Sequence, residues 1–323
     1  MRQIANKSPE PNFISLNREF LKPNSRINAD IFILLGKRYT LYANKDMQIS
    51  FNHLNRLKSR SEKKVYIRNA DGSALYTYFE ENIAFILSKE QVPFEEKAEI
   101  LYQTSYSLIK NIFENKEDLS LLQRVRPFIK DILPFLDRYH MQFYNLIKLY
   151  KSENYTYSHG INVSAILIAL ASKLNISDRE QLTDIGVGGF LLDIGKAEIP
   201  ADIINKKGVL THEENELIRS HPIIGAEIVK KAGLLSPITL DIIAKHHENM
   251  LGTGYPKRIG GQALSIYASM AQVVDTFDAI TSDRPYSQAE SKAVAVKYLL
   301  NRREEYNSRV FLSFLEIIGA EGH

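Results

Sequence analysis

The first 92 residues mix strand-like and helix-like patterns. Two apolar runs, residues 30–35 and 38–43, are separated by a Gly-Lys pair, which predicts a β-hairpin. Residues 64–68 alternate as a strand does and stop at an Asn-Ala-Asp-Gly turn. Apolar positions in residues 47–57 have helical spacing. We therefore expect residues 1–92 to form a small α/β domain with a regulatory or partner-binding role.

The pattern from residue 93 to residue 149 is almost continuously helical. It is interrupted near residues 115–118, and it contains Pro127 and Pro134. A proline inside a helix usually kinks or ends it. We therefore expect two or three helices that connect the front domain to the rest of the chain.

Residues 150–323 keep the helical period throughout, so we expect an all-α domain. A capping box opens one helix at Thr211. Further helices are predicted over residues 178–195, 237–246, 265–282 and 287–300. The chain as a whole is expected to be mainly α.

Composition narrows the possible chemistry. The 323 residues include no cysteine, which excludes disulfides, thiolate zinc sites, iron–sulfur clusters and cysteine nucleophiles. Any metal must therefore bind imidazole and carboxylate. A net charge of +3 is too small to indicate a nucleic acid or an anionic membrane as partner.

No membrane segment is expected either. The longest aliphatic run, residues 163–171, is about half the ~20 residues that a membrane span needs. The first seven residues lack the apolar core of a signal peptide. We expect a cytoplasmic protein.

Histidines and acids gather after residue 155. Asp193 stands in an apolar stretch, where a carboxylate is costly unless it is paired or binds a metal. His246 and His247 are adjacent, and consecutive helical side chains point ~100° apart, so both can reach one cation only where a helix ends. Asp275 and Asp278 share one helix face. A lone histidine such as His159 is, by itself, more often a hydrogen-bonded structural residue than a ligand.

Four motifs, in their order and separation, resemble the HD-GYP family of metal-dependent cyclic dinucleotide phosphodiesterases. They are Asp-Ile-Gly-Lys at 193–196, His-His-Glu at 246–248, Gly-Tyr-Pro at 254–256 and Asp-Arg-Pro-Tyr at 283–286. The resemblance covers about residues 155–286. It implies that the C-terminal domain is an HD-domain helical bundle, and members of this family commonly append a sensory module in front.

The resemblance also implies a two-metal site. Its ligands would be His159, Asp193, His221, His246, His247 and Asp275. Asp193 would bridge the two ions. Nitrogen and oxygen ligands without sulfur suit iron, manganese or another divalent metal. His221, His246 and His247 would complete one position, and His159 and Asp275 would serve the other.

The same resemblance implies roles around the substrate. Asp193 and Lys196 would be catalytic, and Lys196 and Arg284 would neutralise the phosphate. Tyr255 and Asp278 would line the substrate pocket. The substrate in this family is cyclic di-GMP, which is opened to the linear dinucleotide.

Five positions depart from the family pattern, among them Ser269 and Ser287, which stand where an arginine and a basic residue are usual. Leu192 stands where the family has a histidine directly before the bridging Asp193, and leucine cannot bind a metal. Tyr155 replaces the glutamate of members with a third metal, and Leu251 replaces a common aspartate. We therefore expect one firmly bound metal and a second that is weak or absent.

Two functions remain open. The chain is either a cyclic di-GMP phosphodiesterase of reduced or altered activity, or an inactive relative that binds a nucleotide or a protein partner in signalling. Another phosphohydrolase on the same scaffold fits less well, because it would not need the Gly-Thr-Gly-Tyr-Pro sequence.

Overall fold

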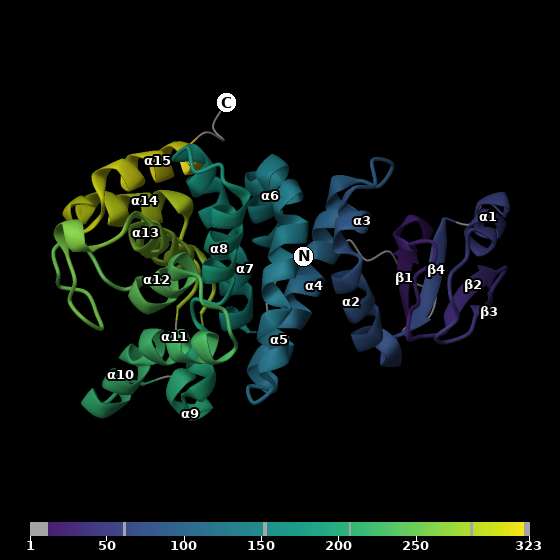
Figure 1. The fold of residues 1–323 in the computed structure, drawn as a ribbon, viewed down its shortest axis with the longest axis horizontal. Coiled ribbons are helices and arrows are strands. Elements are labelled where there is room, and N and C mark those ends of the chain that lie inside the picture. The colour runs from purple at the N-terminus through teal and green to yellow at the C-terminus, as the bar shows by residue number, and fades with distance from the viewer. Residues whose placement is uncertain (1–11, 61–62, 151–153, 207, 285–286, 320–323) are drawn as a thin grey trace. The chain divides into compact units, whose positions relative to one another are not determined.

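The computed structural model of the chain (Figure 1) describes residues 12–60, 63–150, 154–206, 208–284 and 287–319. Pro285 and Tyr286 of the fourth motif, and the first seven residues, lie outside these ranges. The chain divides into two compact units, Met1–Ser107 and Leu108–His323, and the boundary falls inside one long helix, α4 (Phe94–Glu114). The expected mainly-α fold with an α/β part at the front is confirmed.

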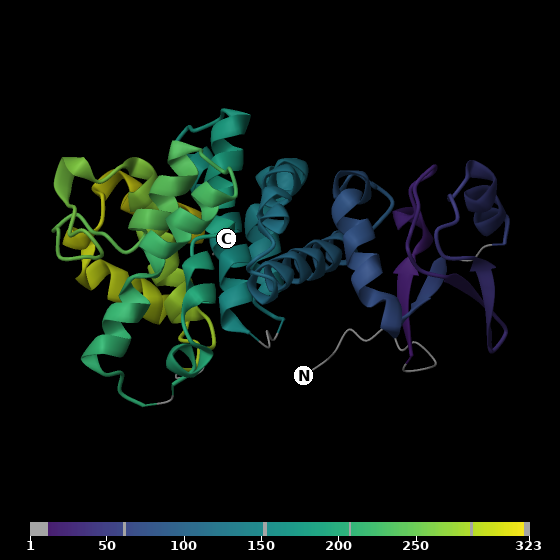
Figure 2. The ribbon, with the colours of Figure 1, turned by 60° about the horizontal axis from the view of Figure 1, so that its bottom comes forward.

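A four-stranded antiparallel sheet forms the centre of the N-terminal unit, purple to blue in Figure 2. Its strands are β1 (Phe13–Asn17), β2 (Ile31–Leu35), β3 (Arg38–Ala43) and β4 (Lys64–Arg68), in the order β1-β4-β2-β3. The predicted hairpin joins β2 and β3. Its turn requires Gly36, whose φ of 62° lies in the left-handed region. Strand β1 was not predicted.

The remaining elements of this unit are short. They are η1 (Arg18–Phe20), α1 (Phe51–Ser59), η2 (Asn69–Asp71), α2 (Gly72–Glu81) and α3 (Ile83–Leu87). Helix α1 begins four residues later than predicted because Ser50 caps it: its hydroxyl accepts the N–H of His53, and Nδ1 of His53 accepts the N–H of Ser50. His53 therefore has a structural role.

The C-terminal unit is a bundle of helices (Figure 1). The helices are α5 (Leu119–Gln123), α6 (Val125–Ile147), α7 (Tyr155–Lys173), α8 (Arg179–Phe190), α9 (Ala201–Ile204), α10 (His212–Arg219), α11 (His221–Lys231), α12 (Pro237–Lys245), α13 (Ile266–Thr281), α14 (Lys292–Asn301) and α15 (Ser308–Gly319). Short 3₁₀ turns are η3 (Ile194–Glu198), η4 (Gly261–Ala263) and η5 (Arg303–Glu305).

Helix α7 is the central helix of this unit. It packs against α6, α8, α13 and α15. Every residue from His159 to Ala171 is buried, as expected for a helix that is apolar on all sides. The first buried turn of α7 therefore carries His159 into the interior of the bundle.

Three sequence predictions need adjustment. Helix α8 ends at Phe190 rather than at residue 195, because the chain turns through residues 191–193 into η3. Helix α14 begins at Lys292 rather than at residue 287, where Ser291 caps it. Helix α6 continues through Pro134, and its backbone is non-helical only at Tyr139.

A search for membrane spans over the described residues found no helix that combines the length and the apolar character needed to cross a bilayer.

Candidate metal centre

Three histidines from the ends of two helices form a compact cluster. His221 is the first residue of α11, and His246 and His247 directly follow Lys245, the last residue of α12. One ring nitrogen from each lies within 4.8 Å of the others. The adjacent histidines converge because the helix ends between Lys245 and His247, as the sequence predicts. This cluster can hold a metal ion.

Hydrogen bonds to the backbone orient two of these rings. Nδ1 of His221 donates to the carbonyl of Ile218 at 2.7 Å, and Nδ1 of His246 donates to the carbonyl of Ile243 at 2.9 Å. A carbonyl oxygen only accepts, so each Nδ1 carries the hydrogen. The two Nε2 atoms then face each other at 3.1 Å. A cation between them satisfies both, so these residues fit a metal.

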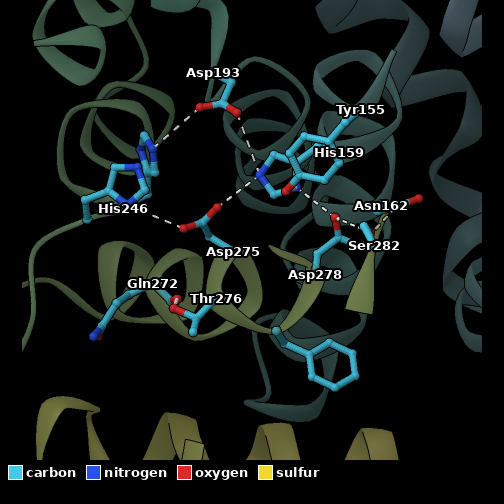
Figure 3. Close-up of polar contacts among 12 residues, drawn as sticks. Tyr155, His159, Asn162, Asp193, His246, Gln272, Asp275, Thr276, Asp278 and Ser282 are labelled. Atoms are coloured by element: carbon cyan, nitrogen blue, oxygen red, sulfur yellow. Dashed lines mark hydrogen bonds and ion pairs between the residues drawn. The ribbon is translucent and has the colours of Figure 1, made fainter. Parts of the chain in front are cut away.

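Asp193 lies between this cluster and His159 (Figure 3). Its Oδ1 is 3.2 Å from Nε2 of His221, and its Oδ2 is 3.8 Å from Nε2 of His159. Lys196 donates to the same Oδ2 at 2.7 Å. Burial would raise the pKa of Asp193, but Lys196 and His221 outweigh it and hold the pKa well below its usual range. Asp193 is therefore an anion placed between the histidine cluster and His159.

Packing explains the glycine in the Asp-Ile-Gly-Lys motif. A Cβ on Gly195 would lie 2.0 Å from the carbonyl oxygen of His221. Only a residue without a side chain lets η3 approach α11 this closely. Gly195 thus helps to bring Asp193 within reach of His221.

A second group of polar side chains surrounds His159. Its Nε2 is 3.0 Å from Oδ1 of Asp275, and its Nδ1 is 2.7 Å from Oδ2 of Asp278 (Figure 3). The other carboxylate oxygen of Asp275 is 3.4 Å from Nδ1 of His247. Asp275 therefore lies between His159 and the histidine cluster, on the opposite side from Asp193.

The charges of these groups follow from burial and from their partners. Burial would lower the pKa of His159, but its hydrogen bonds to Asp275 and Asp278 outweigh burial and raise the pKa to about 9. Burial and the nearby His221 lower the pKa of His246 to about 4. His246 is neutral at pH 7 and can offer a lone pair to a metal.

The three residues predicted to bind substrate have different surroundings in the structure. Tyr255 stacks on His247, with ring centroids 4.5 Å apart, and the Arg219 guanidinium lies 4.4 Å from the Tyr255 ring centroid. Asp278 is completely buried against His159. Arg284 donates to the Tyr155 hydroxyl at 2.9 Å.

Arg284 also carries an unsatisfied donor. Its buried Nε has no hydrogen-bond partner among the residues that the structure describes. A buried donor without a partner costs free energy. Its guanidinium is close to the site, because the Tyr155 hydroxyl that accepts from Arg284 is also 3.0 Å from Nδ1 of His159. An anionic ligand at the site would give this donor a partner.

Sequence reasoning missed two residues at the site, Lys148 and Asn162, and assigned no role to a third, Glu248. Lys148 pairs with Asp278 at 2.8 Å, and Asn162 donates to the same carboxylate at 2.9 Å. Glu248 is completely buried and accepts the backbone N–H groups of residues 257 and 259, which fastens the loop after Tyr255. Asn162 had a signal in the sequence, as a polar residue in an apolar helix, but Lys148 had none.

Leu192 is completely buried and directly precedes Asp193. No imidazole is available at this position. The group around His159 therefore consists of this histidine, Asp275 and the shared Asp193.

Comparison with known proteins places this geometry in a family. The HD domain matches residues 125–310. The cyclic di-GMP phosphodiesterase PA4108 of Pseudomonas aeruginosa is 38% identical over 54% of this chain and 42% of its own length. A cyclic di-GMP phosphodiesterase of Thermotoga maritima is 29% identical over 67% of this chain and 58% of its own length. The chain thus spans about half the length of these curated relatives.

Two further proteins extend the comparison. A 3′3′-cGAMP-specific phosphodiesterase of Vibrio cholerae, number 3, is 34% identical over 44% of this chain and 31% of its own length. The solved structure of Bd1817, an HDG"Y"P protein of Bdellovibrio bacteriovorus, matches 95% of this chain and all of that one with a TM-score of 0.64 and 21% identity, which shows a shared fold. The resemblance found in the sequence is confirmed, and the chain belongs to the HD-domain family.

Proposed function

We propose that this chain is a metal-dependent phosphodiesterase that opens cyclic di-GMP to the linear dinucleotide. The observation that carries the proposal is the convergence of the Nε2 atoms of His221 and His246, 3.1 Å apart and next to the Asp193 carboxylate. The names of the Pseudomonas and Thermotoga relatives support cyclic di-GMP as the substrate.

We propose that the first metal is bound by His221, His246, His247 and Asp193. The second position would use His159, Asp275 and the shared Asp193. With Leu192 in place of an imidazole, it keeps three protein ligands, a number that can still hold a catalytic metal. We therefore infer one firmly bound ion, iron or manganese, and a second that is weak or absent.

A divalent ion held here would lower the pKa of water and polarise the phosphodiester. The chain's own residues would do the rest. Lys196, whose side chain is about one-fifth exposed, remains beside Asp193 and can neutralise negative charge at phosphorus. Arg284 would donate its unpaired Nε to a phosphate oxygen. Tyr255, stacked on His247, offers a ring against which a base can pack.

The test is an assay of purified chain loaded with Mn²⁺ or Fe²⁺ under reducing conditions. We expect cyclic di-GMP to be converted to the linear dinucleotide, and His246→Ala to abolish the conversion. His212→Ala is the matched control, because His212 is an exposed first-turn residue of α10. Full metal loading without any product would contradict the proposal.

The alternative remains an inactive relative that binds a nucleotide or protein partner in signalling. Its support is Leu192, which leaves the second metal position short of a ligand. Isothermal titration with intact cyclic di-GMP separates the two functions, since tight binding without cleavage favours the alternative. In either case we propose a cytoplasmic location, a regulatory or partner-binding domain in residues 1–92, a helical connector in 93–149 and the metal-binding domain in 150–323.

A further inference from the structure

Lys148 connects helix α6 to the interior of the candidate metal centre. It caps the C-terminal end of α6, and its side chain is only one-fifth exposed. Its ammonium group donates to Oδ1 of Asp278 at 2.8 Å, to the carbonyl of Thr281 at 3.2 Å and to the hydroxyl of Ser282. All three acceptors lie at the end of α13, so one cation ties together the ends of two helices.

Asp278 is shielded from solvent, so its charge depends on the groups that surround it in the protein. The carboxylate is completely buried, and a buried charge is costly without compensation. Asn162 donates to the same Oδ1 at 2.9 Å, but an amide brings no positive charge. Lys148 is thus the ammonium group that compensates Asp278 at Oδ1, while Oδ2 faces His159 and accepts from the Ser282 hydroxyl at 3.2 Å.

Asp278 in turn orients His159. Its Oδ2 accepts from Nδ1 at 2.7 Å, which turns Nε2 toward Asp275 and Asp193. Carboxylates that hold the remote nitrogen of a metal-binding histidine in this way fix both ring orientation and tautomer. Since Leu192 leaves the second metal position with three protein ligands, this position depends heavily on the orientation of His159.

We propose that Lys148 is a positioning residue that acts through Asp278 to hold His159 in the orientation that binds the second metal. The inference rests on the proposed function, because it assumes that His159 binds a metal. A His159 ring that binds a metal through Nε2 is neutral, so Lys148 is then the cationic side chain that contacts Asp278. Without the Lys148 ammonium, the buried carboxylate keeps the neutral donors of Asn162 and Ser282 beside the imidazole, so Asp278 holds that ring less firmly. Lys148 does not touch the metal ligands themselves, so the histidine cluster is expected to keep its ion.

The variant that tests this is Lys148→Met, which keeps the length of the side chain and removes the charge. Lys148→Arg should restore the charge and the donors. Lys130→Met is the matched control, because Lys130 lies on the same helix and forms an exposed ion pair with Glu180. Circular dichroism and thermal melting establish that each variant is folded, and Lys148→Gln replaces Lys148→Met if the latter does not fold.

Two measurements avoid reliance on activity. The first is ¹⁵N NMR of the metal-free chain labelled in histidine. We expect Lys148→Met to shift the His159 nitrogen resonances and to leave those of His221 and His246 in place. The second is titration with Mn²⁺, in which the weaker of two affinities should fall about 10–100-fold, as when an outer-shell partner is removed. Lys148→Arg should reverse most of both effects, and Lys130→Met should cause neither.

The outcomes separate this inference from the proposed function. Unchanged His159 resonances in a folded Lys148→Met variant overturn the positioning role, and so does a loss of Mn²⁺ from the histidine cluster together with the weaker position. If the unmodified chain binds one Mn²⁺ only, the NMR comparison decides. If it binds none, the proposed function fails, whatever the resonances of His159 show.

Discussion

Nε2 of His221 and Nε2 of His246 lie 3.1 Å apart, because the Nδ1 atom of each ring donates to a backbone carbonyl and this bond turns Nε2 toward the other ring. A cation bound by both Nε2 atoms would satisfy the two rings together. Burial keeps His246 neutral by lowering its pKa to about 4. The arrangement therefore couples metal binding to the stability of the helices that carry the two histidines.

Metal removal should destabilise the C-terminal unit. A ligand present at 100 times its Kd stabilises a fold by about 2.7 kcal/mol, which for a unit of this size corresponds to about 5–10 °C in Tm. We expect a chelator to lower Tm by this amount in differential scanning calorimetry. A His246→Ala variant should melt at the same temperature with and without the chelator. A chelator-insensitive Tm in the unmodified chain would contradict a bound metal at this cluster.

Asp193 should matter to both metal positions, because its two carboxylate oxygens face opposite groups of ligands. We expect Asp193→Asn to lower total Mn²⁺ binding below that of any single histidine variant. The amide also loses the ion pair with Lys196. Asp184→Asn is the control, since that carboxylate pairs with Arg126 away from the site. Elemental analysis measures the outcome, and a normal metal content in Asp193→Asn would exclude a bridging role.

Several parts of the fold and site could be predicted from residue chemistry alone. The hairpin over residues 31–43 follows from two apolar runs and a glycine that tolerates a positive φ. The convergence of His246 and His247 follows from the angle between consecutive helical side chains together with a nearby helix end. These predictions depend on residues close together in sequence, where local geometry leaves few alternatives.

The features that were missed depend on contacts between distant segments. Lys148 and Asp278 are 130 positions apart, and Lys148 looks like an ordinary surface charge at the end of its helix until α6 and α13 pack. Helix α8 was predicted five residues too long, because the apolar residues Leu191 and Leu192 continue the pattern while the chain already turns toward η3. Burial alone does not distinguish a helix from a buried turn.

The loop that carries Tyr255 should tolerate no side chain at Gly254. A Cβ there would lie 2.3 Å from the carbonyl oxygen of His247, and this contact involves backbone that cannot move aside. We expect Gly254→Ala to displace Tyr255 from His247 and to raise KM for the cyclic dinucleotide at least tenfold. Gly208→Ala is the control, because a Cβ at Gly208 would meet nothing within 4 Å. Equal KM values in the two variants would show that the loop does not contact substrate.

Replacement of Leu192 by histidine should strengthen the second metal position. Leu192→His would place an imidazole directly before Asp193, and a further nitrogen ligand raises affinity for a divalent ion. Because Leu192 is completely buried, the variant should lose about 1–3 kcal/mol of stability in the absence of metal. Added Mn²⁺ should recover that loss, and turnover of cyclic di-GMP should rise with metal content.

Leu191→His provides the matched control for that variant. Leu191 is also buried, and it lies one position further from Asp193 in the same turn. Its replacement should cost similar stability without adding a ligand, so Mn²⁺ should not restore its Tm. Inductively coupled plasma analysis and calorimetry on both variants measure the difference. If Leu192→His changes neither metal content nor turnover, residue 192 lies outside the metal site, and the weak second position needs another cause.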